Sequence, residues 1–307
     1  MLGNLHAGRF LFAPSSELGK YKAAVSLHSH SENSKEGLGF VPRYAPHIPI
    51  LSTFYRLEQS RYTTKNGTGF DFRRAYWLPP LPPEVVVKSE RERIETELHM
   101  RALISISDHD HISIVEGCAP SVEWSIAIHG IPLHLGVYNL PPPNLSEIHA
   151  ELVAQKKPGD QSRVMELLCW LNEYKGTLIV LNHPFADIGS RGVQKVKKAV
   201  FRLLKKAQGL IHALEINGYR PWKENLAVAS LADALDLGLM GGGDRHGCSP
   251  NAILSLSSSQ TLSEYAEEVR CYKQRAVLIM PEYFENPVAR KLQSAVDFFR
   301  SCPEYCI

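Results

Sequence analysis

The sequence predicts an α/β protein with a parallel β-sheet, and three observations point to this class. From about residue 100 onward, short apolar runs typical of strands alternate with amphipathic runs typical of helices. Repeated strand–helix alternation favours a parallel sheet, either open or closed into a barrel. Histidine, aspartate and glutamate residues repeatedly follow the apolar runs, and parallel barrels build active sites at the carboxyl ends of their strands.

The first elements lead directly into these polar residues. An apolar run at 23–27 is followed by two histidines one residue apart, His28 and His30. A helix is predicted over 89–100, and the strand that begins at 101 ends in the polar sequence Asp108-His109-Asp110. Residues 122–140 predict two strands joined by a hairpin-like turn at 129–130.

The alternation continues to the end of the chain. A helix over 160–176 begins with polar residues and stops at a glycine. The segments that follow are predicted as a strand at 177–184, a helix at 192–209, a strand at 211–219, a helix at 222–238, a short strand or loop at 239–247, a helix at 261–274, a strand at 276–280 and a helix at 286–301.

Residues from about 38 to 88 interrupt this pattern. They are rich in proline, glycine and aromatic residues and have no clear periodicity. Four aromatic residues supply apolar area that would anchor the segment: Phe70, Phe72, Tyr76 and Trp77. We therefore expect a single domain over 1–307, with a long ordered insertion at 38–88 that covers the site.

Composition is that of an ordinary globular protein. Of the 307 residues, 44% are hydrophobic and 21% are charged, which is enough to bury a sizeable core. The formal charge of +2 gives no general attraction to nucleic acid or membrane. No apolar stretch is long enough to cross a bilayer, and the first residues lack the pattern of a signal peptide, so a cytoplasmic location is expected.

Metal-binding residue types occur at five predicted strand ends. Each has an ordinary explanation when taken alone: a surface histidine pair, helix-capping aspartates, a solvent-facing glutamate, a common loop tripeptide or a flexible glycine turn. Their joint occurrence favours a metal site, because imidazole and carboxylate are ligands of Zn, Mn and Fe. The five sets are His28 and His30, Asp108 to Asp110, Glu123 with His134, His183, and Asp244 with His246.

This donor set suits phosphoryl chemistry. A carboxylate shared between two ions, with histidines in the other positions, is typical of two- or three-metal centres that activate water and neutralise phosphoryl oxygens. Such a centre requires no serine or cysteine nucleophile. The sequence has neither a G-x-S-x-G elbow nor a G-x-x-x-x-G-K-[ST] phosphate loop.

The ordered motifs resemble those of a known family. The segments LHSHS, ISDHD, SVEWS, LHLGVYN, LNHP, LEING and GGDRH look like those of the PHP (polymerase and histidinol phosphatase) superfamily of metal-dependent phosphoesterases. The resemblance covers about residues 22–250. It implies a distorted seven-stranded β/α barrel with two or three divalent ions, Mn, Fe or Zn, at its carboxyl face.

The resemblance also implies three groups of metal ligands. The first ion would be held by His28, His30, Glu123 and Asp244. Glu123 would bridge to a second ion held by His134 and His183. A third ion would be held by His109, His246 and Glu36; the family often has SDG where this chain has SKEG, so Glu36 is the nearest equivalent.

Further residues are predicted around the ions. Asp108, His246 and Arg191 are the predicted catalytic residues, with Asp108 either orienting a histidine or binding metal directly. Arginine suits phosphate by its forked geometry, so Arg191, Arg220 and Arg245 are candidates near the mouth, and Arg73-Arg74 of the insertion is another. A surface role is the alternative for each arginine.

We therefore expect a metal-dependent hydrolase that acts on a small phosphorylated substrate, a phosphomonoester or a small nucleotide or phosphodiester. An amidohydrolase-like C–N or C–O hydrolase and a non-catalytic metal-binding protein are the alternatives. The basic helix at 192–209 keeps an oligonucleotide substrate open, although a solvated outer face also explains it. The sequence indicates no membrane and no protein partner.

Overall fold

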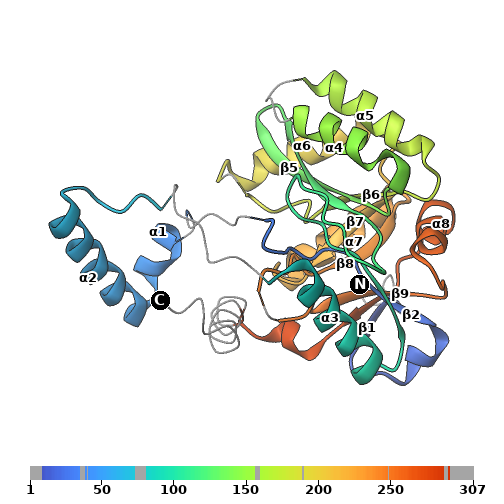
Figure 1. Cartoon of the computed structure of the whole chain (residues 1–307), viewed down its shortest axis with the longest axis horizontal. Coiled ribbons are helices and arrows are strands. Elements are labelled where there is room, and N and C mark those ends of the chain that lie inside the picture. The colour runs from blue at the N-terminus through green and yellow to red at the C-terminus, as the bar shows by residue number, and fades with distance from the viewer. Residues whose placement is uncertain are drawn as a thin grey trace.

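The computed structural model describes residues 9–34, 39, 41–72, 81–155, 160–188, 190–247, 249–286 and 290. Ten strands within this part of the chain form two five-stranded sheets, and helices cover their outer faces (Figure 1). The α/β class predicted from the sequence is consistent with this architecture.

The first sheet combines the two ends of the described chain. Its strand order is β1-β10-β9-β2-β3, in which β2 pairs parallel with β3 and β1 pairs parallel with β10, whereas β9 is antiparallel to both its neighbours. The strands are β1 (Phe10–Phe12), β2 (Ala23–Ser26), β3 (Arg101–Ile104), β9 (Ile253–Ser257) and β10 (Val277–Ile279).

The second sheet is continuous in sequence order, β4-β5-β6-β7-β8. Its first three strands are antiparallel and its last three are parallel. The predicted hairpin is confirmed: residues His129 and Gly130 both have positive φ, 50° and 74°, as a two-residue turn between right-twisted strands requires. The strands are β4 (Val122–Ile128), β5 (Ile131–Tyr138), β6 (Leu178–Asn182), β7 (Ala213–Asn217) and β8 (Gly238–Gly242).

The prediction of a closed seven-stranded barrel is wrong. The two sheets are joined only by isolated bridges, one between Ser29 and Arg245 and one between His109 and Glu123, so no continuous ladder closes a ring of the described strands. The physical reason is strand pairing: the strand–helix alternation indicated parallel neighbours, but β9 enters antiparallel between β2 and β10, and the β4–β5–β6 meander is antiparallel. Both bridges lie just beyond β2, β3 and β8, where the predicted ligands are.

Apolar side chains from both sheets pack together. Val25 and Leu27 from the first sheet pack with Val180 and Met240 from the second in one buried cluster. A larger cluster fills the space between the second sheet and the helices α4 (Leu145–Ala154), α5 (Gln161–Glu173), α6 (Val193–Lys206) and α7 (Trp222–Ala234). A third places α3 (Pro83–Glu92) against the first sheet.

Most predicted helices are present with shifted ends. The helix predicted at 89–100 begins earlier, as α3, and continues through one π-helical turn at Arg93–Glu97. The helix predicted at 261–274 is α8 (Leu262–Tyr272), capped by the Thr261 hydroxyl. The helix predicted at 286–301 lies outside the described residues, apart from 286 and 290.

The insertion contains a long helix that the sequence pattern did not predict. After the short α1 (Val41–Tyr44) comes α2 (Pro49–Asn66), which projects to one side of the sheets (Figure 1) and has no buried residue. Phe70 and Phe72 pack against each other and against Tyr62 and Tyr55 of α2. Tyr76, Trp77, Arg73 and Arg74 lie outside the described residues, and the prediction that the insertion covers the site stays a prediction.

No helix in the described ranges is both long and apolar enough to cross a membrane.

Candidate metal centre

The predicted ligands of the first ion lie together at the edge where the sheets meet. His28 and His30 follow β2, Glu123 is the second residue of β4, and Asp244 follows β8. One donor atom from each of the four lies within 4.8 Å of the others. His28, His30 and Glu123 are fully buried, whereas the Asp244 side chain is 28% exposed and marks the open side of the group.

Hydrogen bonds fix which nitrogen of each histidine faces this group. Nδ1 of His28 contacts Oε1 of Glu215 at 2.5 Å, and Nδ1 of His30 contacts the Ser34 hydroxyl at 3.1 Å. With Nδ1–H donated in each ring, both Nε2 atoms carry lone pairs, and they face each other at 3.2 Å. Two lone pairs at this distance require a positive charge, so a proton or a metal ion must be shared there.

Glu123 is the common member of the donor groups. Its Oε1 lies 3.1 Å from Nε2 of His28 and 3.2 Å from both Nδ1 of His134 and Nε2 of His183. Its Oε2 lies 2.9 Å from Nδ1 of His109. Nε2 of His30 lies 3.4 Å from the same Oε2. One carboxylate therefore faces five imidazoles, which is the arrangement that a bridging carboxylate would need.

Two neutral side chains hold the Glu123 carboxylate in place. Asn182 at the end of β6 donates Nδ2–H to Oε1 of Glu123 at 2.9 Å. Tyr138 at the end of β5 in turn donates its hydroxyl to Oδ1 of Asn182 at 3.2 Å. This chain fixes the amide orientation of Asn182, and so the direction of the carboxylate.

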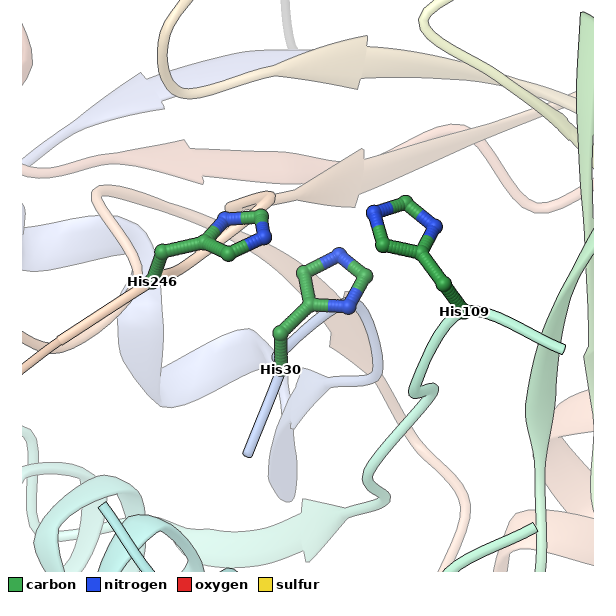
Figure 2. A group of neighbouring side chains, drawn as sticks. All are labelled: His30, His109 and His246. Carbon is green, nitrogen blue, oxygen red and sulfur yellow. The ribbon is translucent and has the colours of Figure 1, made fainter. Parts of the chain in front are cut away.

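A third group consists of the rings of His30, His109 and His246, which come from three separate loops and face one another in Figure 2. The ring centroid of His30 lies 4.2 Å from that of His246 and 4.5 Å from that of His109. The structure thus brings together all the predicted histidine donors. Glu36, the acidic residue predicted for the third ion, lies outside the described residues.

The close packing of ionisable side chains shifts the pKa values of several residues in the centre. Burial disfavours the charged forms, but Glu215 and Glu123 outweigh it and raise the pKa of His28 well above its ordinary value. Burial likewise opposes ionisation of Glu123, yet the surrounding histidines, His28 first, hold its pKa well below its ordinary value. His30 differs, because burial and the neighbouring His246 and His109 lower its pKa well below the ordinary value. The group therefore contains ionised carboxylates and at least one neutral imidazole, which are the forms that bind metal.

Asp108 does not face the donor groups directly. Its carboxylate accepts hydrogen bonds from the backbone N–H of Ser31 at 2.6 Å and from the hydroxyls of Ser31, Ser34 and Ser113. Because the Ser34 hydroxyl also accepts from Nδ1 of His30, Asp108 orients this histidine through one intervening serine. This is the orienting role considered from the sequence, with a serine added.

Two residues of the centre have left-handed backbone conformations. His183 and Asp244 have positive φ, 28° and 50°, a region that costs non-glycine residues about 1 kcal/mol or more. His183 directly follows β6 and Asp244 lies two residues after β8, and both side chains turn toward the same group. The surrounding fold stabilises these conformations.

Glu215 is a site residue that sequence reasoning missed. It lies in the fully buried strand β7, accepts from Nδ1 of His28, and accepts the backbone N–H of His183 at 2.8 Å. A Cβ at Gly242 would lie 1.5 Å from its Oε1, so the glycine run before Asp244 makes room for this carboxylate. The signal in the sequence was a glutamate within an otherwise apolar strand, ALEIN.

The candidate arginines have separate environments. Arg191 is exposed in the loop after β6, with its backbone N–H donating to Asp187 at 2.7 Å. Arg220 forms a two-point contact with Glu224 at 2.7 and 2.8 Å. Arg245, although it stands between Asp244 and His246, is fully buried and contacts the carbonyl of Ser249 rather than the donor groups.

This chain is distantly similar to solved structures, among them the following two. PsfC from Pseudomonas syringae aligns with a TM-score of 0.47 and 15% identity, covering 71% of this chain and 92% of PsfC. A candidate metal-dependent phosphoesterase from Bifidobacterium adolescentis aligns with a TM-score of 0.34 and 13% identity, covering 81% of this chain and 96% of its own. Both TM-scores are below 0.5, so neither similarity assigns a function to this chain. No family model and no curated protein matches the sequence.

Proposed function

We propose that this chain is a metal-dependent phosphoesterase that hydrolyses a phosphomonoester or a small nucleotide or phosphodiester. The observation that carries the proposal is the convergence of two Nε2 lone pairs, 3.2 Å apart, with the carboxylates of Glu123 and Asp244 in a buried group. Imidazole and carboxylate donors in such a group fit Mn, Fe or Zn.

The residues present fit more than one ion. Glu123 Oε2 and His134 Nδ1 are buried and face other members of the donor groups, His109 Nδ1 at 2.9 Å and Glu123 Oε1 at 3.2 Å. His28, His30, Glu123 and Asp244 would hold one ion, and Glu123 with His134 and His183 a second. His109, His246 and Glu36 stay the proposed ligands of a third.

Two or three such ions, when bound, would lower the pKa of a water molecule and neutralise phosphoryl oxygens. The chain's own residues have supporting parts in this proposal. Asp108, through Ser34, keeps the Nδ1 proton of His30 in place, and Glu215 does the same for His28. We propose that His246 and the exposed Arg191 contact the substrate phosphate at the open side, because Asp244 there is partly exposed.

The test is metal analysis followed by turnover on the same sample. Purified protein loaded with Mn, Fe or Zn is expected to hydrolyse nitrophenyl phosphate or its diester, with inorganic phosphate as a competitive inhibitor. Both His28→Ala and Asp244→Ala are expected to abolish turnover. The matched control is His129→Asn, an exposed hairpin histidine with φ of 50° where asparagine is well tolerated, which should leave turnover unchanged.

The alternatives give different results in this experiment. Stoichiometric metal with no turnover on a wide phosphoester panel would contradict the proposal and favour a binding protein. Turnover of amide or lactone substrates without inhibition by phosphate would assign the centre to C–N or C–O hydrolysis instead.

A further inference from the structure

A buried polar cluster adjoins the metal centre without supplying any member of its donor groups. We call it the Glu90 cluster; it consists of Ser26, Ser29, Glu90, Arg245 and Asn251, all nearly or fully buried. Glu90 lies on α3 and belongs to none of the predicted ligand motifs.

The cluster begins at the backbone bridge between the two sheets. Ser29 and Arg245 pair with each other: the His30 N–H donates to the Arg245 carbonyl at 2.9 Å, and the Arg245 N–H donates to the His28 carbonyl at 3.4 Å. Each is the middle residue of a donor-x-donor segment. The middle side chains turn away from the centre, Ser29 toward Asn251 and Arg245 toward the Ser249 carbonyl, whereas the flanking side chains belong to the donor groups.

Glu90 contacts both segments from this opposite side. Its Oε2 accepts the Ser26 hydroxyl at 3.0 Å, and its Oε1 accepts the Asn251 backbone N–H at 2.9 Å and lies 3.5 Å from Nε of Arg245. Ser26 precedes His28 on the same strand end, and Arg245 separates Asp244 from His246. One carboxylate is therefore linked to the backbone that carries four predicted ligands.

Asn251 extends these links to the first segment. Its Nδ2 lies 2.7 Å from the Ser26 hydroxyl, 2.9 Å from the Ser29 hydroxyl and 3.2 Å from the His28 carbonyl. A Cβ at Gly243 would lie 1.5 Å from Oδ1 of Asn251, so the residue before Asp244 also packs directly against the cluster. Small displacements of Asn251 would therefore move both donor-bearing segments.

We propose that Glu90 is a positioning residue of the metal centre, which holds the His28-x-His30 and Asp244-x-His246 segments in register through Arg245, Ser26 and Asn251. The inference rests on the proposed metal centre. A buried ion pair is weak support for stability as such, because the desolvation of both charges offsets their attraction. Its effect is to specify one arrangement of the groups that it joins. Outer residues that orient ligands typically change metal affinity about 10–100-fold when removed.

The test is Mn²⁺ affinity of the full-length protein, measured by competition with a chromophoric chelator. Glu90→Gln keeps the shape of the side chain and a hydrogen-bond acceptor but removes the charge beside Arg245. It is expected to weaken Mn²⁺ binding about 10–100-fold. The matched control is Glu92→Gln, an exposed residue on the same helix, which should leave the affinity unchanged.

A second measurement separates positioning from general stability. Affinity is measured well below the unfolding temperature of each variant, where lower stability alone does not change the affinity of the folded protein. Combining Glu90→Gln with Arg245→Met is then expected to weaken Mn²⁺ binding by less than the product of the two single effects, because both act through one contact. Multiplicative effects would overturn the proposal.

The remaining outcomes distinguish a failure of the proposed function from a failure of this inference. Wild-type protein that binds no Mn²⁺ would contradict the proposed function, whereas wild-type binding with unchanged affinity in Glu90→Gln would contradict this inference alone. If Glu90→Gln does not fold, Ser26→Ala takes its place. Removing that single hydrogen bond to Glu90 should weaken Mn²⁺ binding about 2–10-fold, and an unchanged affinity would overturn the proposal.

Discussion

The edge where the two sheets meet and the insertion helix α2 have opposite patterns of burial. At the edge, Glu123 and His28 are fully buried and each contacts several ionisable groups. On α2, Phe54 and Leu57 are 61% and 51% exposed, and no residue is buried. Polar groups at the edge are buried because partners compensate their desolvation, while apolar groups on α2 remain in water. A substitution at the edge should therefore affect many groups, and one on α2 should act locally.

The largest effect in this comparison is expected from Gly242→Ala. The added Cβ would lie 1.5 Å from Oε1 of Glu215. Glu215 cannot move aside without losing its contacts with Nδ1 of His28 and the backbone N–H of His183. We expect the free energy of unfolding to fall by about 2–3 kcal/mol, together with weaker metal binding, measured by denaturant titration and chelator competition.

The control for this substitution comes from the insertion. A Cβ at Gly69 meets nothing within 4 Å, and its φ is not in the left-handed region. Gly69→Ala should therefore change the free energy of unfolding by no more than about 0.5 kcal/mol. Equal effects of the two substitutions would remove the distinction between the regions.

The second-largest effect is expected on how stability and Mn²⁺ affinity depend on pH at the edge where the two sheets meet. Burial would lower the pKa of His109, but Glu123 outweighs it and raises the pKa to about 8, from an ordinary value near 6.5. In the metal-free protein, the stability that His109 contributes is present below about pH 6.5 and is lost as the pH rises through about 8. Metal must displace the same proton, so Mn²⁺ affinity should fall by up to about tenfold per pH unit below 8.

This pH dependence is checked by Mn²⁺ titration between about pH 6.5 and 8.5, with His109→Gln beside wild type. The variant has no proton to displace at this position, so its affinity should be weaker and less dependent on pH. An identical slope in both proteins would mean that His109 does not exchange its proton for metal.

The smallest effect is expected on α2 itself. Phe54→Ser and Leu57→Ser replace exposed apolar side chains that no described residue buries. The free energy of unfolding, measured by thermal denaturation, should change by less than about 0.5 kcal/mol in each variant. The metal content should remain that of wild type. A loss above about 2 kcal/mol in either variant would show that α2 packs against another part of the molecule.

Sequence patterns predicted the residues of the site better than its surroundings. His28, His30 and His183 were found because ligand residue types recurred after separate apolar runs, which is local information. Their convergence followed from the general rule that strand ends meet at one edge. Arg245 was predicted near the mouth because it stands between two ligands, but its side chain is buried and contacts Ser249 and Glu90 instead.

The fold could be predicted only in part, because strand pairing between distant parts of the chain leaves no local pattern in the sequence. Strand β9 was not predicted, and its antiparallel pairing with β2 joins residues 23–25 to 255–257, a register that no local pattern contains. The ring of strands failed to close for the same reason. Helix α2 was missed because periodicity reveals a helix only through its buried face, and this helix has none.

The backbone bridge between Ser29 and Arg245 has a consequence for how the protein matures. It joins segments more than two hundred residues apart, and two of the three donor groups combine residues from these early and late parts of the chain. Such long-range pairing forms late in folding, because loop closure must come first. During synthesis, a nascent chain that has not yet reached His246 cannot assemble the complete set. If the proposed ions bind, the two donor groups that contain Asp244 or His246 can be filled only after both segments have come together.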